Sequence, residues 1–312
     1  MPASWSSTRE HAVRADLDVT VDLVRGLLAE QHPDLADRTL RVAANGWDNV
    51  MLRLGDDLAV RVPRREIAAH LVEHEQQWLP VLAPRLPVAV PVAVRVGRPS
   101  PTLRYPWSWS VVPWTAGVRA TDVPVERRRR IARPLAAFHR ALHVPAPSGA
   151  PVNPFRSAPL PTRGTALRGR VERGIVPDGE QVLSLWARLV EAPAWHGPPL
   201  WIHGDPHPGN LVLADDDAGS GRGGLAAVVD FGDMTAGDPA TDLAAAWLVL
   251  DAAGREAYRD TLADRYPPGD PVWVRARGWA LSMSTSMLES GLENAWVYRM
   301  GEESLVRVLA DT

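Results

Sequence analysis

Apolar residues between positions 20 and 31 recur at helical spacing. Val21, Val24, Leu27 and Leu28 fall on one side of a helix with 3.6 residues per turn. Pro33 cannot continue such a helix, because it lacks a backbone N–H and its ring crowds the preceding turn. The pattern therefore predicts an amphipathic helix that ends near residue 32.

The apolar spacing then changes from helical to every second residue. Two alternating runs flank the turn Gly55-Asp56-Asp57, and their apolar members are Val50, Leu52, Leu54, Leu58, Val60 and Val62. Alternation on both sides of a short polar turn is typical of a β-hairpin. A helix over about 64–79 and strands interrupted by proline, through Val94 and Tyr105 to Val112, complete the predicted N-terminal part.

The segment Pro113 to Gly117 breaks the strand pattern, and helical spacing prevails after it. It predicts a boundary between an N-terminal lobe of residues 1–113 and a C-terminal lobe of residues 114–312, with a hinge at 112–117. Residues 144–178 are rich in Pro, Gly and Arg and show little periodicity, so they predict a long loop or insertion, mobile or functional. Four helices are expected near 239–250, 253–265, 271–288 and 293–310.

Length and composition favour a globular protein with two lobes and exclude disulfide-bonded and cysteine-dependent classes. With 312 residues, 46% of them hydrophobic, the chain is long enough for two packed lobes. It has no run of about 18 apolar residues, and its first 14 residues lack the apolar core of a secretory signal, which predicts a cytoplasmic protein. The absence of cysteine excludes disulfides, thiolate catalysis and cysteine-bound zinc.

All 34 basic residues are arginine, and the net charge of −3 provides no general basic field for nucleic acid. The densest basic run, Arg127 to Arg130, precedes Ile131, Leu135 and Phe138 at helical spacing. We interpret this run as the solvated end of a helix.

Three polar residues of the C-terminal half carry the candidate chemistry. Phosphoryl transfer requires a carboxylate that orients the attacking hydroxyl and oxygen ligands that place Mg²⁺ on the phosphates. Asp205, Asn210 and Asp230 supply these groups, with the five-residue step of a kinase catalytic loop and a D-F-G beginning at Asp230. The apolar runs 211–213 and 225–229 predict a hairpin that brings Asn210 and Asp230 to the same end.

The sequence resembles the aminoglycoside phosphotransferase family in HGDPHPGN (203–210), DFGD (230–233) and GDPATDLA (237–244). The resemblance extends from about residue 39 to the final helices. It implies an α+β fold of the protein-kinase-like type: a lobe with an antiparallel sheet and a helix, then a larger, mainly helical lobe. In this resemblance Asp205 is the catalytic carboxylate, Asn210 and Asp230 bind Mg²⁺, and His203 supports the catalytic loop. Asp242, close behind a helix start at Pro239, is expected to have a structural role, holding the catalytic loop.

The resemblance also implies ATP or GTP as phosphoryl donor and a small-molecule hydroxyl as acceptor, an aminoglycoside or another antibiotic. A metabolite such as a sugar, an amino alcohol or homoserine is the alternative acceptor. An inactive kinase-fold binding module is the alternative function, although the complete set of Asp205, Asn210 and Asp230 argues against it. Nucleic acid and membranes are not expected as partners, and the chain is expected to be a monomer or a small homo-oligomer.

Leu58 to Arg61 has the form of the kinase V-A-I-K strand, with Ala59 beside a purine and Arg61 on the phosphates. In the following helix Glu75 lies at helical spacing with Ile67, Leu71 and Trp78. A carboxylate within an apolar stripe needs a partner. The resembling proteins pair this glutamate with the strand cation, so Glu75 with Arg61 is expected, and Glu73 is the alternative.

Several weaker candidates remain open. Gly46 and Asn49 belong either to a loop that covers phosphates or to a plain hairpin turn, and Trp114 is either an adenine neighbour or a core residue. His203 with His207 around Asp205 is similar to hydrolase metal motifs, but further ligands are not evident. Candidate acceptor-binding acids are Asp233, Glu289 and Glu293, and the last two equally suit solvated helix faces.

Overall fold

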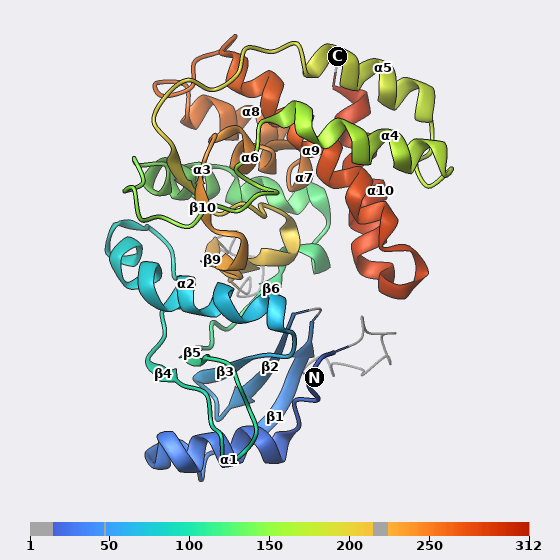
Figure 1. The fold of residues 1–312 in the computed structure, drawn as a ribbon. Coiled ribbons are helices and arrows are strands. Elements are labelled where there is room, and N and C mark those ends of the chain that lie inside the picture. Colours follow the sequence, from blue (N-terminus) through green and yellow to red (C-terminus); the bar gives the residue numbers. More distant parts are fainter. Residues whose placement is uncertain (1–14, 47, 215–223, 312) are drawn as a thin grey trace. The chain divides into compact units, whose positions relative to one another are not determined.

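The computed structural model of the chain describes residues 15–46, 48–214 and 224–311. Its contacts divide the chain into two compact units, which are coloured along the sequence in Figure 1. The first unit holds the residues up to Pro84 together with Val90–Thr115, and the second holds Arg85–Ala89 and the residues from Ala116 onward.

A five-stranded antiparallel sheet forms the first unit, in the order β1-β2-β3-β5-β4. The strands are β1 (Leu40–Asn45), β2 (Asn49–Leu54), β3 (Leu58–Pro63), β4 (Arg95–Gly97) and β5 (Trp109–Pro113). Leu54 pairs with Leu58 across the turn that begins at Gly55, which has a φ of +63°. The β-hairpin that the alternating residues predicted is therefore confirmed.

One helix covers each face of this sheet (Figure 1). Helix α1 (Val21–Gln31) begins at Thr20, whose hydroxyl accepts a hydrogen bond from the Leu23 amide, and it ends before Pro33 as expected. Its buried leucines pack with the alternating residues of β2 and β3 in one apolar core. Helix α2 (Glu66–Leu82) contacts β3 and β5.

The buried face of α2 differs from the predicted one. Ile67 is 60% exposed, so it does not belong to the core. The buried residues are instead Ala68, Val72, Glu75, Leu79 and Leu82. Both sets of residues have helical spacing and both contain Glu75, so periodicity alone could not choose between them. The buried face begins with the small residue Ala68, which allows close approach to the sheet.

Helices dominate the second unit. They are α3 (Ala132–Leu142), α4 (Gly164–Glu172), α5 (Gly179–Leu189), α6 (Ala240–Leu243), α7 (Ala245–Leu248), α8 (Ala252–Thr261), α9 (Pro271–Glu289) and α10 (Ala295–Ala310). Helix α9 is buried along most of its length, and α10 packs along it. An antiparallel sheet in one unit and helices in the other confirm the α+β class.

Two small sheets lie among these helices. Strand β7 (Leu200–Ile202) pairs with β10 (Thr235–Gly237), and β8 (Leu211–Leu213) lies between β6 (Val118–Arg119) and β9 (Leu225–Val228). The β8–β9 hairpin was predicted from its apolar runs, and its connecting turn lies outside the described residues. Both small sheets lead into the polar motifs.

Two expectations for this unit were wrong, and a third holds for only part of its segment. Arg128, assigned to a solvated helix end, is only 4% exposed, and its Nε donates to the Val123 carbonyl in a 3₁₀ segment. Residues 144–178 contain helix α4 and an anchored turn. The helix expected over 239–250 is two short helices, α6 and α7. Among the described residues, no helix has the length and apolar character that a membrane crossing needs.

Candidate active site

The loop of residues 203–210 follows β7 and crosses closely over residues 231–233. Gly204 has a φ of +86°. A Cβ at this position would lie 2.4 Å from the carbonyl oxygen of Asp233, closer than real contacts allow. Glycine is therefore required twice, by the left-handed backbone and by the approach of the second segment. This crossing brings the HGDPHPGN and DFGD motifs together.

The Asp205 carboxylate has partners on both oxygens. Its Oδ2 lies 3.1 Å from His207 Nε2 and accepts a hydrogen bond of 3.2 Å from Asn210 Nδ2. Its Oδ1 accepts a hydrogen bond of 3.1 Å from Arg156 Nη2. Since each carboxylate oxygen has two acceptor positions, Oδ2 is saturated and Oδ1 can accept one more donor.

His207 has a fixed orientation in this cluster. Its Nδ1 accepts a hydrogen bond of 3.0 Å from the Gly209 amide, so the ring proton belongs on Nε2, the nitrogen that faces Asp205. The ring also makes an edge contact with Trp296 of α10, with centroids 6.4 Å apart. His207 thus orients the carboxylate through its Nε2–H, and although burial opposes the shift, the Asp205 carboxylate raises the pKa of this imidazole.

Arg156 joins Asp205 to Asp233, the second carboxylate of the cluster. Its Nε donates to Asp233 Oδ2 over 2.9 Å, and Asn153 Nδ2 donates to Asp233 Oδ1 over 2.8 Å. The turn that carries Arg156 is anchored, because the Asn153 amide donates to Thr235 Oγ1. Arg156 is therefore a fixed cation of the site.

Burial alone would raise the pKa of Asp205, but His207 and Arg156 outweigh it and hold the pKa of this carboxyl well below its usual range. Asp205 is thus ionised at neutral pH. An ionised carboxylate with one free acceptor position can take a hydrogen bond from an incoming hydroxyl group.

Asn210 and Asp230 are brought together by the β8–β9 hairpin. The Val229 amide donates to the Asn210 carbonyl over 2.9 Å, which places Asp230 beside Asn210. Asn210 Nδ2 donates to the carbonyl oxygen and to Oδ2 of Asp205, so the amide oxygen of Asn210 faces away from these two acceptors. Asp230 has a φ of +61°, a left-handed conformation that is costly for a residue with a Cβ.

This donor set fits Mg²⁺. The ion prefers oxygen ligands, takes only one or two carboxylates from the protein, and keeps waters or phosphates in its other positions. No group of three or more histidine or acidic side chains within the described residues could hold a metal. One carboxylate and one amide oxygen therefore match a metal that arrives with nucleotide phosphates, not a metal held by the protein alone.

His203 cannot also serve as a metal ligand in this arrangement. Its Nδ1 accepts from the Asp205 amide over 3.2 Å, and its Nε2 lies 2.9 Å from the Val229 carbonyl, to which it donates. Both ring nitrogens are thus used by the backbone of the two motif segments. The geometry offers no support for the alternative metal motif around His203 and His207.

Asp242 at the end of α6 is fully buried and holds the start of the catalytic loop. Its oxygens accept hydrogen bonds from the His203 amide (2.8 Å) and the Gly204 amide (2.9 Å), and His143 Nε2 lies 3.2 Å away. Although burial alone would raise the pKa of Asp242, hydrogen bonding to His143 and nearby histidines lower it to about 2.

We expect Asp242 to make stability depend on pH in the acid range. A folded pKa of about 2, below the ordinary value near 3.9, means that its contribution is present above about pH 4 and is lost as pH falls toward 2. The shift corresponds to about 2 kcal/mol. Urea unfolding at pH 6 and pH 3 measures it: the stability difference between the wild type and Asp242→Asn should shrink at the lower pH.

The matched control is Asp260→Asn, which changes an exposed acid on α8. It should differ from the wild type by less than about 0.5 kcal/mol at both pH values. An Asp242→Asn variant as stable as this control at pH 6 would contradict the role of Asp242.

In the first unit, Arg61 of β3 and Glu75 of α2 form the ion pair that the sequence predicted. Arg61 Nη1 lies 3.2 Å from Glu75 Oε1, and the two side chains are only 6% and 7% exposed. Glu73, the alternative partner, instead accepts a hydrogen bond from Ser108 Oγ over 3.0 Å. Ala59 is buried on the same strand. The part of this group in nucleotide binding stays a prediction.

The other candidates of the first unit lie at the ends of its strands. The Gly46 amide donates to the Asn49 carbonyl over 2.9 Å, which closes the turn between β1 and β2. Trp114 is partly buried, and the Arg53 guanidinium lies 4.7 Å from the centre of one of its rings. Roles for Gly46, Asn49 and Trp114 in nucleotide binding likewise stay predictions.

Of the two acceptor candidates at the C-terminal helices, Glu289 is not joined to the Asp205 cluster by any contact among the described residues. Glu289 forms ion pairs with Arg170 (2.7 Å) and Arg173 of the α4 region. The side chain of Glu293 lies outside the described residues. Asp233, the third candidate, contacts the cluster through Arg156.

Sequence reasoning missed Arg156 and Asn153. Both lie in the segment without periodicity, and Arg156 is 49 residues from Asp205 and 77 from Asp233. No local pattern marks one arginine among 34 as a partner of a distant carboxylate. His207 stands within the motif itself, and its spacing of two from Asp205 could have indicated contact.

Comparison with known proteins agrees with the resemblance of the sequence. No curated protein matches the chain. Among solved structures, it is similar to the GDP and kanamycin complex of APH(2")-IIia, with 20% identity and a TM-score of 0.67 over 93% of this chain and 99% of that chain. Macrolide 2'-phosphotransferase MphH from Brachybacterium faecium shows 23% identity and a TM-score of 0.58, over 94% and 99% of the two chains.

The streptomycin-ATP-APH(2")-IIa ternary complex is also similar, with 18% identity and a TM-score of 0.55 over 93% of this chain and 97% of that one. At these identities the structures show a shared fold. The model of the phosphotransferase enzyme family matches residues 39–279, which is well over half of the chain. Sequence motifs, fold and family model agree: the chain belongs to the phosphotransferase enzyme family.

Proposed function

We propose that this phosphotransferase moves the γ-phosphoryl group of ATP or GTP to a hydroxyl group of a small molecule. The first candidate for this acceptor is an aminoglycoside or another antibiotic. The observation that supports the transfer best is the state of Asp205, an ionised carboxylate with one acceptor position open on Oδ1. The proposal includes the cytoplasm, where ATP and GTP are abundant, as the compartment of the reaction.

Asp205 would orient the acceptor hydroxyl and take its proton as the phosphoryl group is transferred. Arg156 remains on the same oxygen and keeps the carboxylate ionised, while His207 and Asn210 fix the direction of its other oxygen. Mg²⁺, held by Asn210 and Asp230, would neutralise charge on the phosphates. Arg61, fixed by Glu75, would bind phosphate oxygens in the first unit.

The proposal that the acceptor is an antibiotic is supported by the solved structures to which the chain is similar. Kanamycin and streptomycin are bound in two of the similar structures, and a third is a macrolide phosphotransferase. A sugar, an amino alcohol or homoserine would need the same Asp205 chemistry and remains the second candidate. An acceptor panel with ATP or GTP, read by the mass increase of one phosphate, tests both, and transfer to no hydroxyl compound would favour a binding module.

We expect Asp230→Asn and Asn210→Ala each to raise the Mg²⁺ concentration needed for half-maximal activity, because each removes a hard oxygen ligand. Asparagine is the suitable replacement at 230, since it tolerates the left-handed backbone better than most residues. Nucleotide turnover titrated with Mg²⁺ measures the effect. An unchanged Mg²⁺ requirement in either variant would remove that residue from the ligand set.

A further inference from the structure

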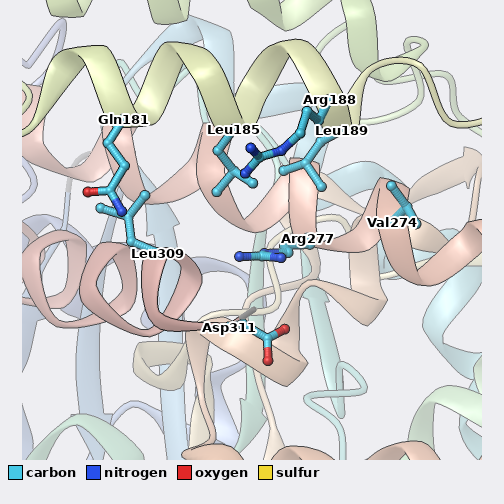
Figure 2. A pocket seen from close by; sticks show the side chains of 8 residues that line it. All are labelled: Gln181, Leu185, Arg188, Leu189, Val274, Arg277, Leu309 and Asp311. Carbon is cyan, nitrogen blue, oxygen red and sulfur yellow. The ribbon is translucent and has the colours of Figure 1, made fainter.

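A pocket of about 480 Å³ lies where α5, α9 and α10 meet, away from the motifs (Figure 2). Its apolar wall consists of Leu185, Leu189, Val274 and Leu309. The volume falls in the range of small-molecule sites, which are mostly apolar with a few polar groups that orient the ligand.

Two arginines face this pocket from opposite helices. Figure 2 shows the side chain of Arg188 coming from α5 and that of Arg277 from α9, with the two guanidinium groups one above the other in the pocket. Arg277 donates from Nε and Nη2 to one neutral acceptor, the Val308 carbonyl, over 3.2 and 2.7 Å. Arg188 makes no hydrogen bond or ion pair with any residue that the structure describes.

The one acid in the lining, Asp311, does not balance these two charges. Its Oδ1 accepts from Arg255 over 2.7 Å and its Oδ2 accepts from Trp247 Nε1 over 2.8 Å. Asp311 thus already forms an ion pair with a third arginine, Arg255. Burial, with the like charges of Arg255 and Arg188, lowers the pKa of Arg277 although Asp311 opposes the shift.

The pocket and the Asp205 cluster contact opposite ends of α10. Trp296, near the start of the helix, touches His207, and Val308, near its end, binds Arg277. Twelve residues at a rise of 1.5 Å separate these positions by about 18 Å. An occupant of the pocket would therefore not overlap the group that reacts at Asp205.

We propose that this pocket is a second ligand site, which binds a small organic anion with its phosphate or carboxylate group between Arg188 and Arg277 and its apolar part against the leucines. Guanidinium groups pair with both kinds of oxyanion, often through two parallel hydrogen bonds. The anion would relieve the repulsion between the two cations. The inference does not depend on the identity of the phosphotransferase acceptor.

Isothermal titration of the full chain with four probes tests the proposal: hexyl phosphate, hexanoate, hexanol and inorganic phosphate. We expect hexyl phosphate or hexanoate to bind with a Kd below about 1 mM, and hexanol and inorganic phosphate to bind at least about tenfold more weakly. The tighter of the first two identifies the preferred oxyanion. Failure of both to bind would overturn the proposal.

Three variants locate the binding. Arg188→Gln should weaken it at least about tenfold without loss of fold, since Arg188 has no partner within the described part of the chain, and Val274→Ser should weaken it by removing an apolar contact. Arg133→Gln, which changes an exposed arginine on α3, is the matched control and should bind as the wild type does. Equal affinity of Arg188→Gln and the wild type would show that the probes bind elsewhere, and the site would be rejected.

Discussion

Asp205→Ala should lower kcat by about 10²- to 10⁴-fold and leave nucleotide affinity nearly unchanged, because in the proposed reaction the carboxylate acts on the acceptor hydroxyl and not on the nucleotide. Arg156 and His207 hold this carboxylate ionised, which is the state that a base requires. Steady-state turnover of an accepted substrate measures the first effect, and titration with nucleotide measures the second.

Measuring turnover and nucleotide affinity separately distinguishes loss of the base from loss of structure. A general loss of structure would lower both turnover and nucleotide affinity, whereas loss of the base lowers turnover alone. Asp260→Ala, a change of an exposed acid on α8, should behave like the wild type in both assays. If Asp205→Ala kept more than about a tenth of the wild-type kcat, an effect below about 1.4 kcal/mol, the assignment would be wrong.

The second large effect concerns stability. Arg61→Met or Glu75→Gln should each destabilise the protein, Arg61→Met by about 3–5 kcal/mol, because it leaves a buried charge without its counterion. The two side chains are 6% and 7% exposed and 3.2 Å apart, so water cannot replace the lost partner well. The double variant should lose less than the sum of the singles, since no unpaired charge remains.

Urea unfolding of the four proteins in this cycle gives the coupling energy directly. Glu73→Gln is the matched control, because Glu73 lies on the same helix but bonds to Ser108 and not to Arg61. Combined with Arg61→Met, it should show additive effects within about 0.5 kcal/mol. Additivity between positions 61 and 75 as well would mean that their contact contributes nothing to folding.

The elements that the sequence predicted well are those whose pattern is local. Alternation around Gly55 determines the β2–β3 hairpin, and the buried helical position of Glu75 placed it opposite Arg61 on the neighbouring strand. The two motifs also fixed the proximity of Asn210 and Asp230, because a short hairpin joins them. In each case the information lies within about 20 residues of chain.

The positions of Arg156 and Arg128 could not be predicted, because they depend on contacts and packing that no local sequence pattern records. Arg156 reaches Asp205 only because its turn is bonded to Thr235 through Asn153, and neither end of that connection has a sequence signature. Arg128 belongs to a basic run that has the composition of a surface, yet its guanidinium binds the Val123 carbonyl. Burial of an arginine is decided by the packing around it, and composition does not contain that information.

At position 230 the left-handed backbone favours glycine, whereas the proposed activity requires the aspartate side chain. Most residues with a Cβ pay about 1–2 kcal/mol for this conformation, aspartate pays less, and glycine would relieve the strain that remains. Asp230→Gly would therefore relieve backbone strain while removing the carboxylate that we propose as a ligand of Mg²⁺. Directed evolution for heat resistance alone would favour this change, so a library screened without an activity assay should drift toward proteins that are better folded and unable to transfer phosphate.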